Sequence, residues 1–199
     1  AEGAHVIAVD LAEQCAEARL TNISHLQSGS IDTYPCDLLS DQPLEEFCRD
    51  VIKGSLNFMV HNAAMTGESG EPGYLGAVSE QGDEAFDRAL ALNLSVPFKL
   101  TKRLLPALER GSPSAVVNVA SIYGLVSPDF TLYSGTNRGT PAGYAASKGG
   151  LIQLTRYLAG ALAPTIRVNA VAPGGIERGQ GEHFVDSYNS RTPLGRMAT

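Results

Sequence analysis

The sequence predicts an α/β protein built on a doubly wound parallel sheet in a single domain. Two observations lead to this prediction. Short, nearly continuous apolar runs rich in β-branched residues recur along the chain, and longer helix-like stretches separate them. Each run ends in polar or glycine-rich residues. Ligands of open α/β sheets bind at the carboxyl ends of the strands, so this is where a site is expected.

Four runs are short enough, and apolar enough, to be strands buried on both faces of a sheet. They are residues 5–9 (HVIAV), 56–60 (LNFMV), 115–119 (AVVNV) and 166–171 (IRVNAV).

Three stretches between them predict helices over residues 42–53, 83–108 and 144–162. In the second, Pro97 is expected to kink the helix and Pro106 to end it. Residues 66–82 and 127–143 are rich in glycine and turn-forming residues and predict loops. Both are longer than usual connections, so each is a candidate for function or for disorder.

The composition restricts the function. The chain has 199 residues, 43% hydrophobic and 18% charged, which suffices for one buried core. A formal charge of −6 without a basic run argues against a nucleic-acid or anionic-membrane binder. No apolar run is long enough to span a membrane, and the first ten residues do not resemble a signal peptide. The three cysteines lack zinc spacing and predict free thiols, a cytoplasmic location and no metal site.

Tyr144 and Lys148 stand four residues apart in a predicted helix and would share a face. A neighbouring cation favours phenolate, so the pair could act as an acid or base near neutral pH. The alternative is two residues on a partly exposed helix face. Ser121 follows a strand just upstream, where it could instead be a strand-end cap. Asn93 lies inside the long helix, where it could instead mark a kink.

These residues, taken in order, resemble the short-chain dehydrogenase/reductase family over residues 5–197. The family's Asn-Ser-Tyr-Lys set corresponds to Asn93, Ser121, Tyr144 and Lys148. Its asparagine-rich turn corresponds to residues 61–64 (HNAA), with His and Ala in place of the first Asn and the Gly. Its segment before the substrate lid corresponds to residues 167–175 (RVNAVAPGG). The resemblance implies a Rossmann-like, three-layer fold.

The resemblance also implies roles in hydride transfer between NAD(H) and an alcohol or carbonyl substrate. Tyr144 would exchange a proton with the substrate oxygen, and Ser121 would hold that oxygen. Lys148 would bind the nicotinamide ribose and lower the pKa of Tyr144, and Asn93 would hold a water in a proton relay. Residues 178–191 would form a substrate lid.

The cofactor predicted is NAD, with NADP less favoured. Asp10 ends the first run, where a carboxylate can accept hydrogen bonds from the adenosine ribose and repel a 2′-phosphate. No Arg or Lys precedes Arg19. Asp37 would lie near the adenine, although it could be a helix N-cap that competes with Ser40 and Asp41. The full set of cofactor-binding candidates is Asp10, Leu11, Asp37, Leu38, Asn62, Ala63, Ala64, Tyr144, Lys148, Pro173, Gly174 and Ile176.

The family's first strand, glycine-rich turn and first helix have no counterpart in this sequence, nor do its last helix and strand. Residues 1–199 are therefore expected to form a partial dinucleotide-binding domain. The stretch between Ser121 and Tyr144 is longer than usual and resembles an extended branch of the family that acts on nucleotide sugars. A sugar-like alcohol is accordingly expected, and the substrate contacts predicted are Tyr123, Tyr133, Asn137 and Arg138.

Two other function classes remain open: a non-catalytic dinucleotide-binding or sensor protein, and a scaffold for assembly. Fold alone does not separate these from an enzyme. The complete set of four residues favours the enzyme, because a binder needs no Tyr/Lys pair. The resemblance also implies a homodimer or homotetramer formed through the helices at residues 83–108 and 144–162.

Overall fold

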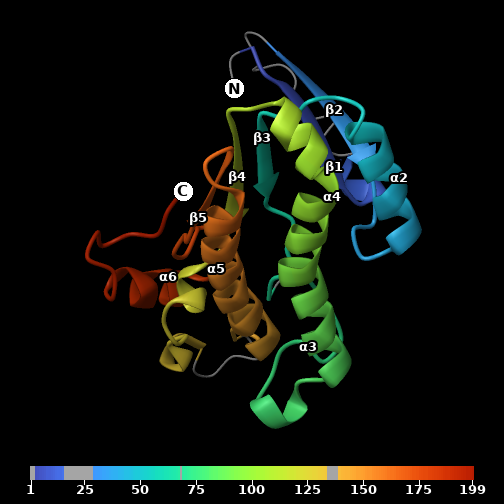
Figure 1. The fold of residues 1–199 in the computed structure, drawn as a ribbon. Helices are drawn as coiled ribbons and strands as arrows, with labels where there is room; N and C mark the ends of the chain where they lie inside the picture. Colours follow the sequence, from blue (N-terminus) through green and yellow to red (C-terminus); the bar gives the residue numbers. More distant parts are fainter. Residues whose placement is uncertain (1–2, 16–28, 68, 134–138) are drawn as a thin grey trace.

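The computed structural model describes residues 3–15, 29–67, 69–133 and 139–199. It confirms an α/β fold with parallel strands (Figure 1). Two parallel sheets are present among these residues. In one, β1 (His5–Asp10) pairs with β2 (Ser30–Pro35). In the other, β4 (Ser114–Val119) lies between β3 (Phe58–His61) and β5 (Ile166–Val171).

All four predicted strands are present, and β2 is an additional strand that the apolar runs did not predict. Its sequence, SIDTYP, alternates polar and apolar residues instead of forming a continuous apolar run. Its exposure alternates as well, because Ile31 and Thr33 are half-buried and Asp32 is exposed. It pairs in parallel with β1 along its whole length.

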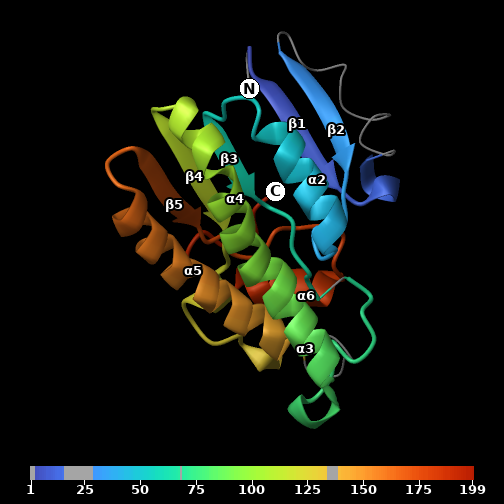
Figure 2. The ribbon, with the colours of Figure 1, turned by 45° about the vertical axis from the view of Figure 1, so that its right-hand side comes forward.

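Helices cover one face of the three-stranded sheet (Figure 2). They are α2 (Asp41–Val51), α4 (Val96–Arg110) and α5 (Ala142–Leu162), and α3 (Asp83–Leu90) precedes α4. The last helix, α6 (Glu182–Asn189), follows β5. The 3₁₀ turns Val78–Glu80 and Phe130–Tyr133 lie within the two predicted loops, and a third, Ile122–Gly124, precedes the second loop.

The long helix predicted over residues 83–108 is not one α-helix. A π-helical turn, Ala91–Ser95, separates α3 from α4, and Pro97 is the second residue of α4, directly after this turn. The prediction that Pro106 ends the helix is wrong, because α4 continues to Arg110. Ala107 and Leu108 after the proline are completely buried, so packing holds the last turn in place.

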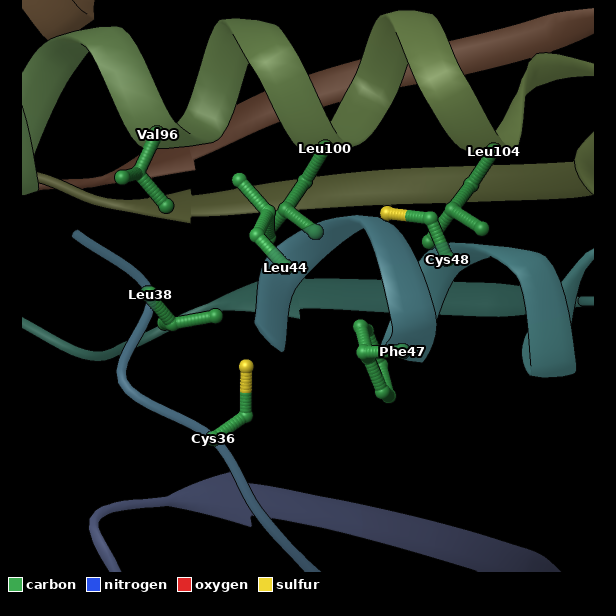
Figure 3. Packing of buried hydrophobic residues seen from close by; sticks show 8 residues of the cluster. All are labelled: Cys36, Leu38, Leu44, Phe47, Cys48, Val96, Leu100 and Leu104. Atoms are coloured by element: carbon green, nitrogen blue, oxygen red, sulfur yellow. The ribbon is translucent and has the colours of Figure 1, made fainter. Parts of the chain in front are cut away.

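The largest apolar cluster joins α2, α4 and the segment after β2 (Figure 3). Its buried members are Cys36, Leu38, Leu44, Phe47, Cys48, Val96, Leu100 and Leu104. A second cluster forms between α5 and the sheet around Val116, Leu158 and Ile166. Cys15, Cys36 and Cys48 are free thiols, as predicted, and all three are buried.

Candidate active site

Lys148 is buried against the sheet, although it lies on a helix. Its side chain is on the same face of α5 as Tyr144, and Nζ lies 5.6 Å from the centre of the Tyr144 ring. Nζ also donates a 2.7 Å hydrogen bond to the carbonyl of Val119, the last residue of β4. Lys148 is 3% exposed, and burial lowers its pKa to about 8. Lys148 is thus buried, whereas Tyr144 on the same face is half-buried.

Ser121 lies two residues after the end of β4 and caps the 3₁₀ turn Ile122–Gly124. Its Oγ accepts a 3.2 Å hydrogen bond from the N–H of Tyr123, so the serine hydrogen is left to donate elsewhere. The turn packs directly on α5 at Gly124, where a Cβ would lie 2.7 Å from the main chain of Lys148. Only glycine permits this approach, which brings Ser121 to the helix that carries Tyr144.

Asn93 is buried in the π-helical turn, and its amide joins three parts of the chain. Its Oδ1 accepts from the N–H of Met65 (2.7 Å), and its Nδ2 donates to the Met65 carbonyl and to Ser147 Oγ (3.0 Å each). Ser147 donates in turn to the carbonyl of Tyr144, and Tyr74 donates to that of Met65. Asn93 thus lies in a π turn, and π turns occur often at functional sites.

Ser121 and Tyr144 line the same cavity, which has a volume of about 700 Å³. This is within the size range of small-molecule sites. Four further predicted residues line it: Tyr123, Tyr133, Gly174 and Ile176. Asn137 and Arg138 lie outside the described residues. Lys148 and Asn93 are packed behind Tyr144 and do not line the cavity.

The predicted cofactor residues lie at the carboxyl ends of the strands. Asp10 is the last residue of β1 and Leu11 follows it; both are exposed, and the Asp10 carboxylate accepts a 2.8 Å hydrogen bond from the N–H of Leu11. Asn62 and Ala63 follow β3 and are also exposed, whereas Ala64 is half-buried.

His61, the last residue of β3, is buried. Its Nε2 lies 3.1 Å from Thr101 Oγ1, and burial lowers its pKa to about 4. Pro173 and Gly174 follow β5; Pro173 is half-buried and Gly174 exposed.

Asp37 and Leu38 have local structural partners. The Asp37 carboxylate accepts hydrogen bonds from the N–H of Leu39 (3.0 Å) and from Ser40 Oγ (2.8 Å), just before α2 begins. The Leu38 side chain belongs to the largest apolar cluster. The expected contacts of these two residues with an adenine remain predictions.

The cavity also has walls that no sequence pattern assigned. Leu132, Thr140, Phe184, Tyr188 and Met197 all line it. Phe184 and Tyr188 stand four residues apart in α6, within the predicted lid, so helical spacing could have indicated them. Leu132 and Met197 carry no local signal, because their position depends on contacts between distant segments.

Among the described residues, no group of three or more His, Cys, Asp or Glu side chains is placed to hold a metal ion. None of the helices described there is both long and apolar enough to cross a bilayer.

Known proteins resemble the chain over nearly its whole length. The protein family described as Enoyl-(Acyl carrier protein) reductase matches residues 1–199. The chain is 30% identical over 205 residues to the 3-oxoacyl-[acyl-carrier-protein] reductase FabG of Thermotoga maritima, covering 98% of this chain and 75% of that protein.

Solved structures share the fold. A short-chain dehydrogenase/reductase of the glucose/ribitol dehydrogenase type from Brucella melitensis superposes with a TM-score of 0.75 at 28% identity, over 98% of this chain and 72% of that one. A short-chain dehydrogenase from Leptospira borgpetersenii with bound NAD+ (TM-score 0.77, 23% identity) covers 100% of this chain and 82% of its own. The RhlG/NADP active-site complex of Pseudomonas aeruginosa has a TM-score of 0.78 at 23% identity, and the match covers 98% of this chain and 74% of that one. The last two show the fold alone.

Proposed function

The chain belongs to the short-chain dehydrogenase/reductase family of oxidoreductases, which act on alcohol and carbonyl groups, and we propose that it transfers a hydride between NAD(H) and such a substrate. One observation carries the proposal. Ser121 and Tyr144 line one cavity, and the buried Lys148 lies behind the Tyr144 ring. Two hydroxyls and a cation thus meet where a substrate oxygen could be bound and protonated.

The roles follow from the hydrogen bonds. Ser121 accepts from Tyr123 and has a hydrogen left to hold a substrate oxygen. Tyr144 exchanges the proton with that oxygen. Lys148 is held by the Val119 carbonyl with Nζ 5.6 Å from the centre of the Tyr144 ring, and we retain for it the predicted part in activating Tyr144. Asn93 positions the π turn and, through Ser147, the first turn of α5, and we retain for it the predicted part in a proton relay.

The residues at the strand ends have the chemistry that a nicotinamide dinucleotide requires. Asp10 offers an exposed carboxylate to the adenosine ribose, Lys148 would hold the nicotinamide ribose, and the small residues of the turn after β3 allow a flat ligand to approach. The bound cofactor would supply or accept the hydride. We propose NAD over NADP, because Asp10 would repel a 2′-phosphate.

The remaining predicted contacts are kept as proposals: Leu11, Asp37, Leu38, Asn62, Ala63, Ala64, Pro173, Gly174 and Ile176.

We also propose that residues 1–199 are part of a longer dinucleotide-binding domain. Among the described residues, β1 pairs only with β2, and β3 pairs only with β4. A further parallel strand between β1 and β3 would join the two sheets. The glycine-rich turn that follows such a strand in this family would complete the pyrophosphate site.

Assembly and location are proposed from surface features. Phe98 on α4 and Tyr157 on α5 are exposed at 42% and 66%, and these helices lie side by side in both views (Figures 1 and 2). We propose that these helices pack against a second copy to form a homodimer or homotetramer, which light scattering would test.

The three free thiols support a cytoplasmic location, which cell fractionation would test.

The experiment that tests the function uses the protein at the full length of its gene. Oxidation of secondary alcohols is followed through NADH and NADPH absorbance in wild type and in Tyr144→Phe. Turnover with NAD that falls by about 10²-fold or more in the variant supports the proposal. Cofactor binding without turnover that depends on Tyr144 would instead favour a non-catalytic binding protein.

A further inference from the structure

Two distant segments close the cavity together, and we call these segments, residues 127–133 and 178–197, the cover. The ring of Tyr133 lies 5.6 Å from that of Phe184, which lies 6.1 Å from that of Tyr188. At the outer side, Arg191 Nε forms a 3.0 Å ion pair with Asp129. The cover is therefore a single packed wall and not two independent loops.

The cover presents aromatic and aliphatic surface to the cavity. Leu132, Tyr188 and Met197 form a buried cluster, against which Tyr133 and Phe184 pack. All five residues line the cavity, and Leu75 and Ile122 add further aliphatic surface.

The hydroxyl groups of Tyr188, Tyr133 and Thr140 on this wall each make one hydrogen bond within the protein. The Tyr188 hydroxyl accepts a 2.6 Å hydrogen bond from the N–H of Gly175. The Tyr133 and Thr140 hydroxyls bond to each other at 3.3 Å. Burial and the neighbouring Tyr133 raise the pKa of Tyr123, so this phenol stays neutral. These internal bonds use part of the hydrogen-bonding capacity of the wall, and most of the surface that it presents to the cavity is aromatic or aliphatic.

The charged groups at the cavity also favour an apolar ligand. No carboxylate lines it among the residues that the structure describes, and its charged or titratable lining groups other than tyrosines are Arg178 and His183, both exposed. Ser121 and Tyr144 are the polar groups at the part of the cavity where the proposed reaction takes place.

We propose that the substrate is a ketone or secondary alcohol carrying a bulky apolar group, preferably an aromatic ring, which packs against Tyr133 and Phe184. This inference rests on the proposed function, and it replaces the sugar-like alcohol expected from the sequence. Offset or edge-to-face packing of a substrate ring on the two side chains would supply the selectivity.

The test compares 1-phenylethanol, 2-butanol and ribitol as substrates of the full-length protein with NAD. We expect kcat/KM to be highest for 1-phenylethanol. The variant Phe184→Ala should lower kcat/KM for 1-phenylethanol about tenfold to a hundredfold, and should change kcat/KM for 2-butanol less. Phe184→Leu keeps an apolar residue and controls for misfolding of α6. Phe130→Ala, an exposed aromatic residue of the same segment that does not line the cavity, should leave all three values unchanged.

A binding measurement separates this inference from the proposed function. Acetophenone and ribitol are titrated into the protein calorimetrically, with NAD present. Binding of acetophenone that Phe184→Ala weakens, together with no turnover of 1-phenylethanol with NAD or of acetophenone with NADH, would support the apolar cavity and overturn the oxidoreductase proposal. Preference for ribitol in binding or in turnover would overturn the inference, as would binding of neither ligand.

Discussion

The buried ammonium of Lys148 should make the stability of the protein depend on pH in a way that one substitution reveals. Lys148→Met keeps a long, unbranched side chain and removes the charge. Lys148 is 3% exposed, and burial lowers its pKa from 10.5 to about 8. The charge therefore destabilises the folded state wherever the amine is protonated.

The expected magnitude follows from this pKa. A fall from 10.5 to about 8, at about 1.4 kcal/mol for each pKa unit, corresponds to about 3 kcal/mol. Below pH 8 both folded and unfolded states hold the proton, so the full cost is present. Between pH 8 and pH 10.5 the unfolded state binds more protons than the folded state, so stability rises with pH in this window.

The assay is urea unfolding of wild type and Lys148→Met at constant ionic strength across this pH range. The difference in unfolding free energy, wild type minus variant, should rise by about 3 kcal/mol from pH 8 to pH 10.5. Cys36, Cys48 and the buried tyrosines also titrate in alkali, but they are common to both proteins and cancel in the difference. A difference that stays flat across the window would refute the reasoning.

Three further predictions concern other parts of the site. Asn93→Ala should lower the unfolding free energy by about 3 kcal/mol in urea, because the side chain makes three buried hydrogen bonds; a loss below about 1 kcal/mol would contradict this. Asp10→Ser should raise kcat/KM for NADPH relative to NADH about tenfold, because it removes the charge that repels a 2′-phosphate, and an unchanged ratio would argue against a ribose contact. Gly175→Ala should lower the melting temperature, at a cost of about 1–3 kcal/mol, because a Cβ would lie 2.8 Å from the Tyr188 ring. Gly160→Ala, with nothing within 4 Å, is the matched control and should stabilise the helix by about 0.5–1 kcal/mol.

Much of the fold could be predicted because its signals are local. A run such as residues 115–119 is apolar throughout, as a strand covered on both faces requires, and β4 is found there. The spacing of Tyr144 and Lys148 depends only on the helix that carries them. Strand β2 was not predicted because its polar residues interrupt the apolar run. The predicted helix end at Pro106 was wrong because the packing of the two residues after it overrides the local effect of the proline.

Most of the strands and helices could be predicted from the sequence, as could the resemblance of Asn93, Ser121, Tyr144 and Lys148 to the set of one family. These features depend on residue type and on spacing over a few positions. Only the tertiary structure decided that Lys148 is buried, that Asn93 is tied to Met65 and Ser147, and that the cover gives the cavity an apolar wall. Those contacts join segments far apart in the chain, and no local periodicity encodes which distant surfaces will pack together.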